Sequence, residues 1–432
     1  MSSSVRNWRV LAAISAGSLV LAACGGGDDS NDDNVAASAA PSAATSGPAG
    51  PSNEADGELV VGTLLPQTGS LASLGPPEFA GVDLAVKDIN EAGGVLGKPV
   101  KNIDSDSGDT STNIASSSVD RLLSQKVDTI VGAASSAVTL TVIDKVTGAG
   151  VLMISPANTS LKLTDYPDKD LYFRTAPSDL LQGRILGDKV IADGNSSAGI
   201  LALQDAYGTG LADTAEKAIK GANGEVVEKI IYDPKAAEFS AEVSKIKAKD
   251  PEAVIVIGFN ETAKIIQELV KQGIGPQTKK LYLVDGNLEA AEVQALGPVI
   301  AGVQGTTPGA PAPGDFRQRV LAVDPSLKAF PYAGESYDAT ILVALAAEAA
   351  KSDSGKNIAA KMMEVSTGGK KCTTFKDCIA LAKAGTDFDY DGISGPIEFD
   401  KLGNPTEATI GIFTYGPDAK LLEKVEYKSG KL

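Results

Sequence analysis

Short apolar runs alternate along the chain with longer segments whose apolar residues recur at helical spacing. From residue 58 onward, the runs with strand character are 58–64, 100–104, 127–131, 151–154, 171–174, 199–203, 226–232, 253–258 and 281–284. The segments between them predict helices over 77–91, 111–125, from 135, 178–192, from 209, 238–248 and 262–272. In the first of these helices, Phe79, Val82, Val86 and Ile89 fall on one face. This alternation is typical of an α/β fold, in which crossover helices connect the strands of parallel sheets.

The part of the chain that follows residue 57 is too long for one core. At about 375 residues it exceeds what a single hydrophobic core usually serves, so two lobes are expected. The Pro- and Gly-rich segment 305–313 has the composition of a crossing between lobes. A long helix is predicted over 331–351, and short strands with turns over 395–427. The sequences VDTIVGAASSAVT and EAVIVIGFNETAK share the order strand, glycine, polar turn and helix, which predicts one copy in the middle of each lobe.

Two neighbouring predicted strands end in turns rich in hydroxyl groups. Ser135 and Ser136 follow the strand at 127–131, and the turn 155–160 follows the strand at 151–154. Ligands of an open parallel sheet lie beyond the carboxyl ends of its strands. Free N–H groups at a helix N-terminus favour an anion, so the two turns together suggest a site for a carboxylate. For either turn alone, helix capping is a sufficient explanation of the Ser and Thr residues.

The N-terminus has the pattern of an export signal. Two arginines precede an uncharged segment, 10–23, that is too short to span a membrane. It ends in Leu-Ala-Ala before Cys24, which resembles the bacterial lipobox, in which the cysteine becomes the lipidated N-terminus after cleavage. We therefore expect a lipoprotein signal peptide at 1–23 and a lipid anchor at Cys24, on the extracytoplasmic face of the cell membrane. An ordinary signal peptide with a chance cysteine is the alternative. Residues 24–57 are mostly Gly, Ser, Ala, Asp, Asn and Pro, and are expected to form a disordered tether.

Composition and charge exclude several classes of function. A formal net charge of -16, 5% aromatic residues and the lack of a basic run argue against nucleic-acid binding. The chain contains no His, which excludes a His-based catalytic triad or metal site, and no G-x-S-x-G or phosphate-loop motif is present. We therefore expect a protein that is not an enzyme and that has no cofactor.

Two cysteines, Cys372 and Cys378, remain after the one assigned to the lipid anchor. Disulfides persist outside the cytoplasmic membrane, and the spacing of these residues does not match the C-x-x-C of redox or metal pairs. We predict a disulfide between them, with a metal or redox pair as the competing interpretation.

Residues 387–398 carry a motif whose interpretation stays open. Their acidic residues and one glycine fit the D-x-D-x-D-G-x5-E spacing of a calcium loop: Asp387, Asp389, Asp391, Gly392 and Glu398. A proline lies inside the loop, and the sequence after it has strand rather than helix character. A solvated acidic turn is therefore the preferred interpretation, and calcium the alternative.

Several motifs between residues 58 and 427 resemble the periplasmic leucine/isoleucine/valine-binding proteins of ABC importers. They are PQTGSLASLGPPEFAGVDLAVKDINEAGG, VGAASS, GVLMISPANTS, FRTAPSD, QDAYGTGLA and SGPIEFD. The resemblance implies a type I periplasmic binding protein fold, in which two Rossmann-like lobes are joined by three crossings and bind an amino acid between them. It places residues 58–176 plus 306–393 in the N-terminal lobe, and residues 177–305 plus 394–432 in the C-terminal lobe. It also implies a monomer that delivers its ligand to an ABC permease in the membrane.

The same resemblance assigns roles to residues of the first lobe. Ser135 or Ser136, together with Ala157 and Thr159, would bind the carboxylate and part of the ammonium of the amino acid. Leu74 would form a wall of the pocket for the ligand side chain, which is expected to be branched or otherwise aliphatic.

In the second lobe, the resemblance points to three residues. Tyr207 would close on the ligand, and Asp285 would pair with the ammonium. Phe259 lies where the family often has a tyrosine, so one hydroxyl contact is missing there. On composition alone, Asp285 precedes a glycine and also fits a simple turn. Two alternatives stay open for the function, namely a small amide or urea as the ligand, or a receptor ectodomain that passes closure to a signalling partner.

Overall fold

The computed structural model describes residues 54–432. The expected signal peptide at 1–23, the anchor at Cys24 and nearly all of the expected tether lie outside the described residues. In the part of the chain that is described, no helix combines the length and the apolar character needed to cross a membrane.

The first sheet has five parallel strands in the order β2-β1-β3-β4-β5. Its strands are β1 (Val60–Leu64), β2 (Lys101–Ile103), β3 (Thr129–Gly132), β4 (Leu152–Ser155) and β5 (Tyr172–Arg174). The helices that alternate with them are α1 (Gly75–Glu91), α2 (Ile114–Ser124) and α3 (Ser136–Gly148). Each of these elements lies within a few residues of its predicted position, because the strands are apolar runs and the helices keep one apolar face.

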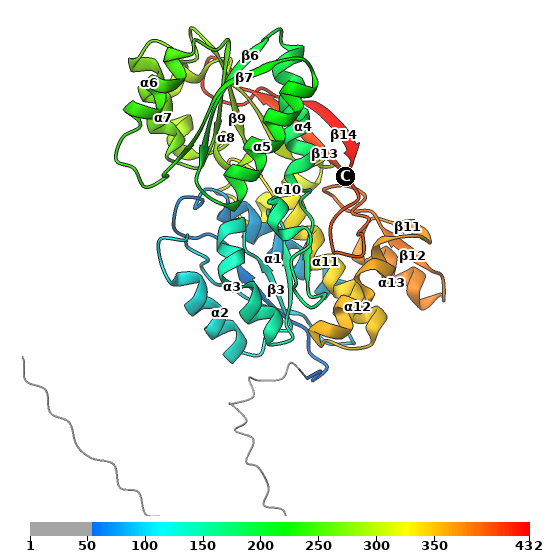
Figure 1. Cartoon of the computed structure of the whole chain (residues 1–432). Helices are drawn as coiled ribbons and strands as arrows, with labels where there is room; N and C mark the ends of the chain where they lie inside the picture. Colours follow the sequence, from blue (N-terminus) through cyan, green and yellow to red (C-terminus); the bar gives the residue numbers. More distant parts are fainter. Residues whose placement is uncertain (1–53) are drawn as a thin grey trace, which may run out of the picture. The chain divides into compact units, whose positions relative to one another are not determined.

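The second sheet has seven strands in the order β14-β13-β10-β9-β8-β6-β7. The parallel strands are β6 (Ser197–Leu203), β7 (Glu225–Tyr232), β8 (Ala253–Ile257), β9 (Lys280–Val284) and β10 (Gln304–Pro308). The strand β13 (Glu407–Thr414) pairs antiparallel with β10, and β14 (Glu426–Lys431) pairs antiparallel with β13. Its helices are α4 (Asp179–Ala192), α5 (Ala206–Gly221), α6 (Ser240–Ala248), α7 (Thr262–Lys271) and the short α8 (Asp285–Leu288) and α9 (Ala291–Gln294). Figure 1 shows the helices of each sheet packed along its faces.

The five parallel strands of the two sheets follow one topology. The order β2-β1-β3-β4-β5 in the first sheet is matched by β7-β6-β8-β9-β10 in the second. The two similar sequence segments therefore form β3 with α3 and β8 with α7, the third strand of each sheet and the helix after it. This confirms the two Rossmann-like halves of a type I periplasmic binding protein fold.

Separate hydrophobic cores cover the faces of the first sheet. One core packs α1 and the later helix α11 (Ala333–Ala350) against β1, β3 and β4. The other packs α2 and α3 against the opposite face. Helix α11 is apolar on nearly all sides and is buried along most of its length, between α1 and α12 (Gly355–Ser366).

A small subdomain follows α11 and was only partly predicted. It contains α12, β11 (Lys370–Cys372), α13 (Phe375–Lys383) and β12 (Phe388–Tyr390), and the helix α10 (Phe316–Val323) precedes α11. The sequence pattern did not indicate α10 or α12. A disulfide joins Cys372 to Cys378, as expected, and ties the end of β11 to α13.

The acidic residues of the calcium-like motif surround a lysine. Lys371 Nζ lies 2.8 Å from Asp389, 2.9 Å from Asp391 and 3.3 Å from Glu398. Asp389 lies in β12 and is only 2% exposed, so the segment is not the solvated turn that was expected. Among residues 54–432, no set of three or more Cys, Asp or Glu side chains is arranged to bind a metal.

Two boundaries between the lobes differ from those expected. The strand β10 includes residues 306–308, which were expected in the first lobe, because it pairs with β9 as far as Thr306 and with β13 as far as Pro308. Residues after 393 were expected in the second lobe, yet Ile397 and Phe399 belong to the hydrophobic core of the first sheet. The chain joins the second sheet only at β13.

One buried carboxylate fixes the crossing after β12. Asp338 on α11 accepts hydrogen bonds from the Ile393 and Ser394 N–H groups at 2.9 and 2.7 Å. It also accepts the hydroxyls of Ser394 at 2.6 Å and of Tyr390 at 2.7 Å. With four donors, this side chain sets where the chain leaves the first sheet.

Candidate functional site

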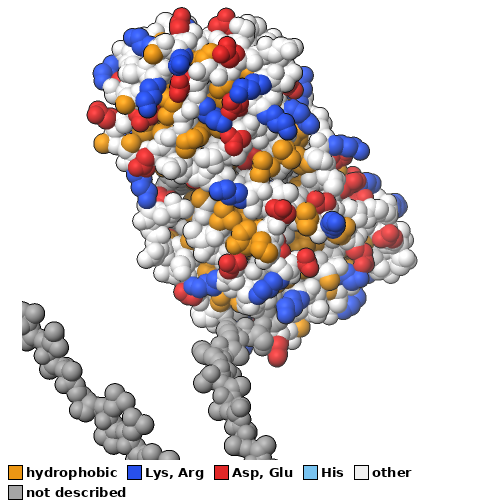
Figure 2. Space-filling model, in the orientation of Figure 1, with side chains coloured by type: hydrophobic (Ala, Val, Ile, Leu, Met, Phe, Trp, Pro, Cys, Tyr) orange, Lys and Arg blue, Asp and Glu red, His pale blue; other side chains and the backbone are white. Residues whose placement is uncertain are grey.

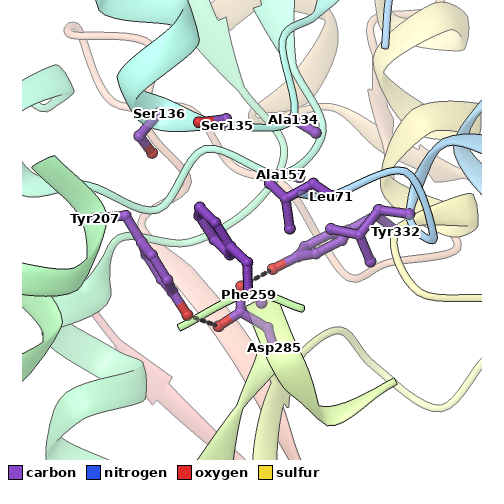
Figure 3. Close-up of a pocket in the computed structure, with 11 residues that line it drawn as sticks. Leu71, Ala134, Ser135, Ser136, Ala157, Tyr207, Phe259, Asp285 and Tyr332 are labelled. Carbon is purple, nitrogen blue, oxygen red and sulfur yellow. Dashed lines mark hydrogen bonds between the residues drawn. The ribbon is translucent and has the colours of Figure 1, made fainter. Parts of the chain in front are cut away.

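A small cavity lies where the carboxyl ends of strands from both sheets meet. Its lining residues follow β1, β3 and β4 of the first sheet and β6, β8 and β9 of the second, with one more residue just before α11. They are Leu71, Leu74, Ala134, Ser135, Ser136, Ala157, Tyr207, Phe259, Asp285, Gly286 and Tyr332 (Figure 3). Because the two sheets share one topology, equivalent loops of each half form opposite walls.

Small residues at the ends of β3 and β4 form the wall on the side of the first sheet. Ser135 caps α3 and accepts the Val138 N–H at 3.3 Å, and the Ser136 hydroxyl accepts the Ser160 N–H at 3.3 Å. The N-terminus of the 13-residue helix α3 therefore borders the cavity. Such a terminus stabilises a nearby anion.

Asn158 holds the two turns of this wall together. Its amide group donates to the Ala133 and Ala134 carbonyls, both at 2.9 Å, and its carbonyl accepts the Tyr172 hydroxyl at 2.9 Å. The side chain is completely buried. The relative position of the turns is thereby fixed before any ligand enters.

A single carboxylate dominates the opposite wall. Asp285 Oδ1 accepts hydrogen bonds from Gln182 at 2.6 Å and from the Tyr207 hydroxyl at 2.8 Å, and Oδ2 accepts the Tyr332 hydroxyl at 2.6 Å. Figure 3 shows Tyr207 and Tyr332 reaching Asp285 from two sides. The donors come from α4, from α5 and from the segment before α11, so this carboxylate is oriented by three separate elements.

Burial controls the charge of Asp285 and of a second acid behind it. Burial raises the pKa of Asp285, and the hydrogen bonds from Tyr332, Gln182 and Tyr207 oppose this. For Asp179, burial and then the negative charge of Asp285 raise the pKa well above the usual range. Neither carboxylate oxygen of Asp179 has a hydrogen-bond partner of ordinary geometry in the described chain. The three donors around Asp285 favour its charged form, whereas the charge of Asp285 disfavours ionisation of Asp179.

Two aromatic rings and a glycine complete this wall. Tyr207 and Phe259 are stacked, with ring centroids 5.7 Å apart and an angle of 7° between their planes. A Cβ on Gly286 would lie 2.8 Å from the Gly258 carbonyl oxygen and 2.9 Å from the Phe259 ring, so only a glycine leaves room for this packing. The glycine that first suggested a simple turn thus has a packing role.

Seven of the eight residues expected to contact a ligand line the cavity, and Thr159 does not. Thr159 is buried one step further back, where its carbonyl accepts the Asp179 N–H at 2.8 Å. The sequence did not indicate Leu71, Ala134, Gly286 or Tyr332. Ala134 and Gly286 are next to predicted residues in the sequence, and Leu71 lies three residues before the predicted Leu74. Tyr332 follows no strand, and only the tertiary structure brings it to the site.

A buried arginine supports the cavity from behind. Arg174, at the end of β5, is completely buried and donates to Asn404 Oδ1 at 2.8 Å, to the Ser160 carbonyl at 2.9 Å and to the Thr164 hydroxyl at 2.9 Å. It also reaches the Asn158 carbonyl at 3.3 Å. The guanidinium thus fastens the turn after β4 to the crossing at residue 404.

Two buried acids between α1 and α11 lie beside the site. Glu78 is completely buried, and neither of its carboxylate oxygens has a hydrogen-bond partner within residues 54–432. Burial and the charge of Glu335 raise the pKa of Glu78 well above normal. Burial raises the pKa of Glu335, 5% exposed, to about 8.

We expect Glu335→Gln to make the protein less sensitive to alkaline pH. Between the ordinary pKa of 4.5 and about 8, the folded state keeps a proton that the unfolded state has lost, so the free energy of unfolding falls as the pH rises. Glutamine mimics the protonated acid and has no such dependence. Urea unfolding should show that, from pH 5 to pH 8, the free energy of unfolding of the variant rises relative to that of the wild type by a few kcal/mol.

The exposed Glu91→Gln on α1 is the control for the loss of one charge. Its free energy of unfolding should follow that of the wild type at both pH values. Parallel behaviour of Glu335→Gln and the wild type would show that Glu335 is ionised throughout.

Comparison with known proteins agrees with this geometry. Residues 58–409 match the model of the periplasmic binding protein family. The chain is 28% identical over 259 residues to Leu/Ile/Val-binding protein homolog 3 of Brucella melitensis, which covers 57% of this chain and 69% of that protein. It is 26% identical over 397 residues to BasB of Halobacterium salinarum, the substrate-binding protein of a chemotactic signal transduction system, with 84% and 92% covered.

A solved structure shows the same fold with a ligand. The branched-chain amino acid transporter substrate-binding protein LivJ of Streptococcus pneumoniae, in complex with isoleucine, superposes with a TM-score of 0.70. It is 26% identical, and the match covers 86% of this chain and all of LivJ. The family match extends over most of the chain and includes both walls of the cavity. This chain therefore belongs to the periplasmic binding protein family, a family of substrate-binding proteins of ABC transporters.

Proposed function

We propose that the protein captures an aliphatic amino acid, for example a branched-chain one, between its two sheets. The observation that carries this proposal is the placement of opposite electrostatic features across one small apolar cavity. The N-terminus of α3 suits a carboxylate on one wall, and the anionic Asp285 suits an ammonium on the other. Leu71, Leu74 and Phe259 leave apolar surface for a side chain.

Capture works by closure of the two halves around the ligand. The cavity has a volume of only about 20 Å³, which is the size expected when the walls are already close together. Opening at the crossings would admit the ligand, and closure would expel water and strengthen the contacts of both charged groups. The Ser160 hydroxyl, which donates to the Ala206 carbonyl at 2.6 Å, is one contact that closure makes between the halves.

The ligand would then pass to a permease in the membrane. The family places such proteins outside the cytoplasm. We propose a monomer tethered through a lipid on Cys24 and a flexible segment to residue 57. Figure 2 shows basic and acidic side chains interspersed over the visible face.

Cys24→Ala should release the protein from the membrane. Without the thiol, no lipid can be attached, and the described part of the chain has no helix that could hold it in a bilayer. Fractionation of cells that make the variant should recover it in the soluble extracytoplasmic fraction. Membrane retention equal to that of the wild type would contradict the anchor, and substitution of an exposed serine on α2, Ser117→Ala, serves as the control.

A second candidate function is ligand sensing. The match to BasB supports a substrate-binding protein that reports occupancy to a signalling partner instead of a permease. Deletion of the gene would separate the two functions, because loss of uptake of the bound ligand indicates transport and loss of taxis toward it indicates sensing.

A thermal-shift screen of the purified protein with free amino acids tests the ligand class. A ligand at 100 times its Kd should stabilise the protein by about 2.7 kcal/mol. We expect leucine, isoleucine, valine or alanine to give the largest shifts. If none of them shifts the transition at millimolar concentration and a small amide or urea does, the amide class replaces the amino acids.

A further inference from the structure

We call the small cavity between Ser135 and Asp285 the amino-acid cavity, after its proposed ligand. A second, larger cavity lies next to it. It has a volume of about 600 Å³, within the range of ligand pockets in general. Two crossings between the sheets border it, through residues 307–312 and 393–394, and the C-terminal segment 413–427 forms its far side. We call this space the crossing cavity. Its walls include Pro308, Phe316 and Phe413, so they offer apolar contact.

Tyr332 is the one residue that lines both cavities. It is 2% exposed, and its hydroxyl donates to Asp285 inside the amino-acid cavity. Its backbone has a φ of 57°, in the left-handed region that few residues other than glycine adopt. The fold therefore holds the ring in place from both ends, at the backbone and at the hydroxyl.

Tyr332 borders two cavities of very different size. On one side lies a cavity of about 20 Å³, and on the other a cavity thirty times larger. Glu335 and Thr307, both buried, border the larger side just beyond the ring. A ligand side chain that extends past Leu71 and Leu74 would meet this ring.

We propose that Tyr332 sets the upper size limit of the ligand by closing the amino-acid cavity off from the crossing cavity. This inference rests on the proposed function and goes further by naming the residue that excludes large side chains. When the ring is absent, the crossing cavity becomes a compartment for an aromatic side chain, whose faces contact Phe316 and Phe413. Aliphatic amino acids do not reach that far and gain nothing from the additional space.

Three variants of the purified protein test this assignment by calorimetric titration with valine, leucine, phenylalanine and tryptophan. Tyr332→Ala removes the ring and opens the partition. Tyr332→Phe keeps the ring and removes only the hydroxyl that donates to Asp285. Phe413→Ala removes a ring of similar size that lines the crossing cavity alone.

We expect the ratio of the Kd for leucine to the Kd for phenylalanine to rise at least tenfold in Tyr332→Ala. The same ratio should stay within threefold of the wild type in Tyr332→Phe and in Phe413→Ala. A ratio is the correct measure, since loss of the hydroxyl changes the affinity of every ligand that pairs with Asp285. If Tyr332→Ala does not fold, Tyr332→Gly replaces it, because glycine accepts the positive φ without strain.

Two results would overturn the inference, and they differ from each other. If the wild type binds leucine or valine and the leucine-to-phenylalanine Kd ratio of Tyr332→Ala stays within threefold of the wild-type ratio, Tyr332 is not the size limit. If none of the four binds to the wild type or to any variant, the proposed function is wrong, and the inference is wrong with it.

Discussion

Asp285→Asn is expected to weaken amino-acid binding by about 10-fold to several hundred-fold, since a charged hydrogen bond in a water-poor site contributes roughly 1.5–3 kcal/mol. The substitution keeps the shape of the side chain. It removes the charge that would pair with the ammonium, which then stays buried without a counterion. Titration of wild type and variant with leucine, isoleucine, valine and alanine measures the loss.

The fold should tolerate Asp285→Asn better than the site does. Gln182 can still donate to the remaining carbonyl oxygen, and the Tyr207 and Tyr332 hydroxyls can rotate. Asp193→Asn is a matched control, because Asp193 also accepts a tyrosine hydroxyl, from Tyr282 at 2.7 Å. Asp193 lies at the C-terminal end of α4, whereas Gln182, which contacts Asp285, lies near the N-terminal end. Equal binding by Asp285→Asn and the wild type would reduce Asp285 to a structural residue.

Arg174→Met is expected to lower the free energy of unfolding by about 3 kcal/mol or more, because each buried acceptor left without its partner costs about 1–3 kcal/mol. Methionine fills much of the volume but donates no hydrogen bond. The Ser160 carbonyl and the Asn404 side chain then lose the donor that joins them. Urea unfolding gives the difference directly.

The exposed Arg184→Met on α4 is the control for loss of a positive charge. The Arg184 side chain donates one hydrogen bond of 3.3 Å, to the Lys431 carbonyl. Its substitution should lower the free energy of unfolding by less than about 0.5 kcal/mol, as is usual at the surface. If the two variants unfold at the same urea concentration, Arg174 does not hold the turn after β4 to the crossing.

The parts of the fold that depend on local pattern were predictable. β3 and β8 are apolar runs followed by a glycine and a polar turn, and this pattern placed both strands. Ser135 was a candidate from its place after a predicted strand, because ligands meet the carboxyl ends of parallel strands, whereas Tyr207 and Asp285 were named by the family resemblance. The resemblance to a known family then gave each a role.

The parts that depend on long-range contacts were not predictable from pattern. Tyr332 reaches the cavity only because α11 packs against α1, and no local signal marks it. The position of the crossing at 393–394 is set by Asp338, which lies 55 residues before Ile393 in the sequence. The family resemblance placed residues 394–432 in the second lobe, although the side chains of Ile397 and Phe399 belong to the core of the first sheet.

The packing of α1 against α11 also affects the order in which the chain acquires its structure. Helix α11 is synthesised about 240 residues after α1, an interval of roughly 10–50 s at ordinary rates of translation. During that interval the apolar face of α1 lacks its main partner, whereas the five parallel strands of the second sheet, within residues 197–308, are already complete. We expect the second sheet to fold first, and the core between α1 and α11 of the first sheet to form last. The amino-acid cavity, which needs both halves and Tyr332, would be the final feature to form.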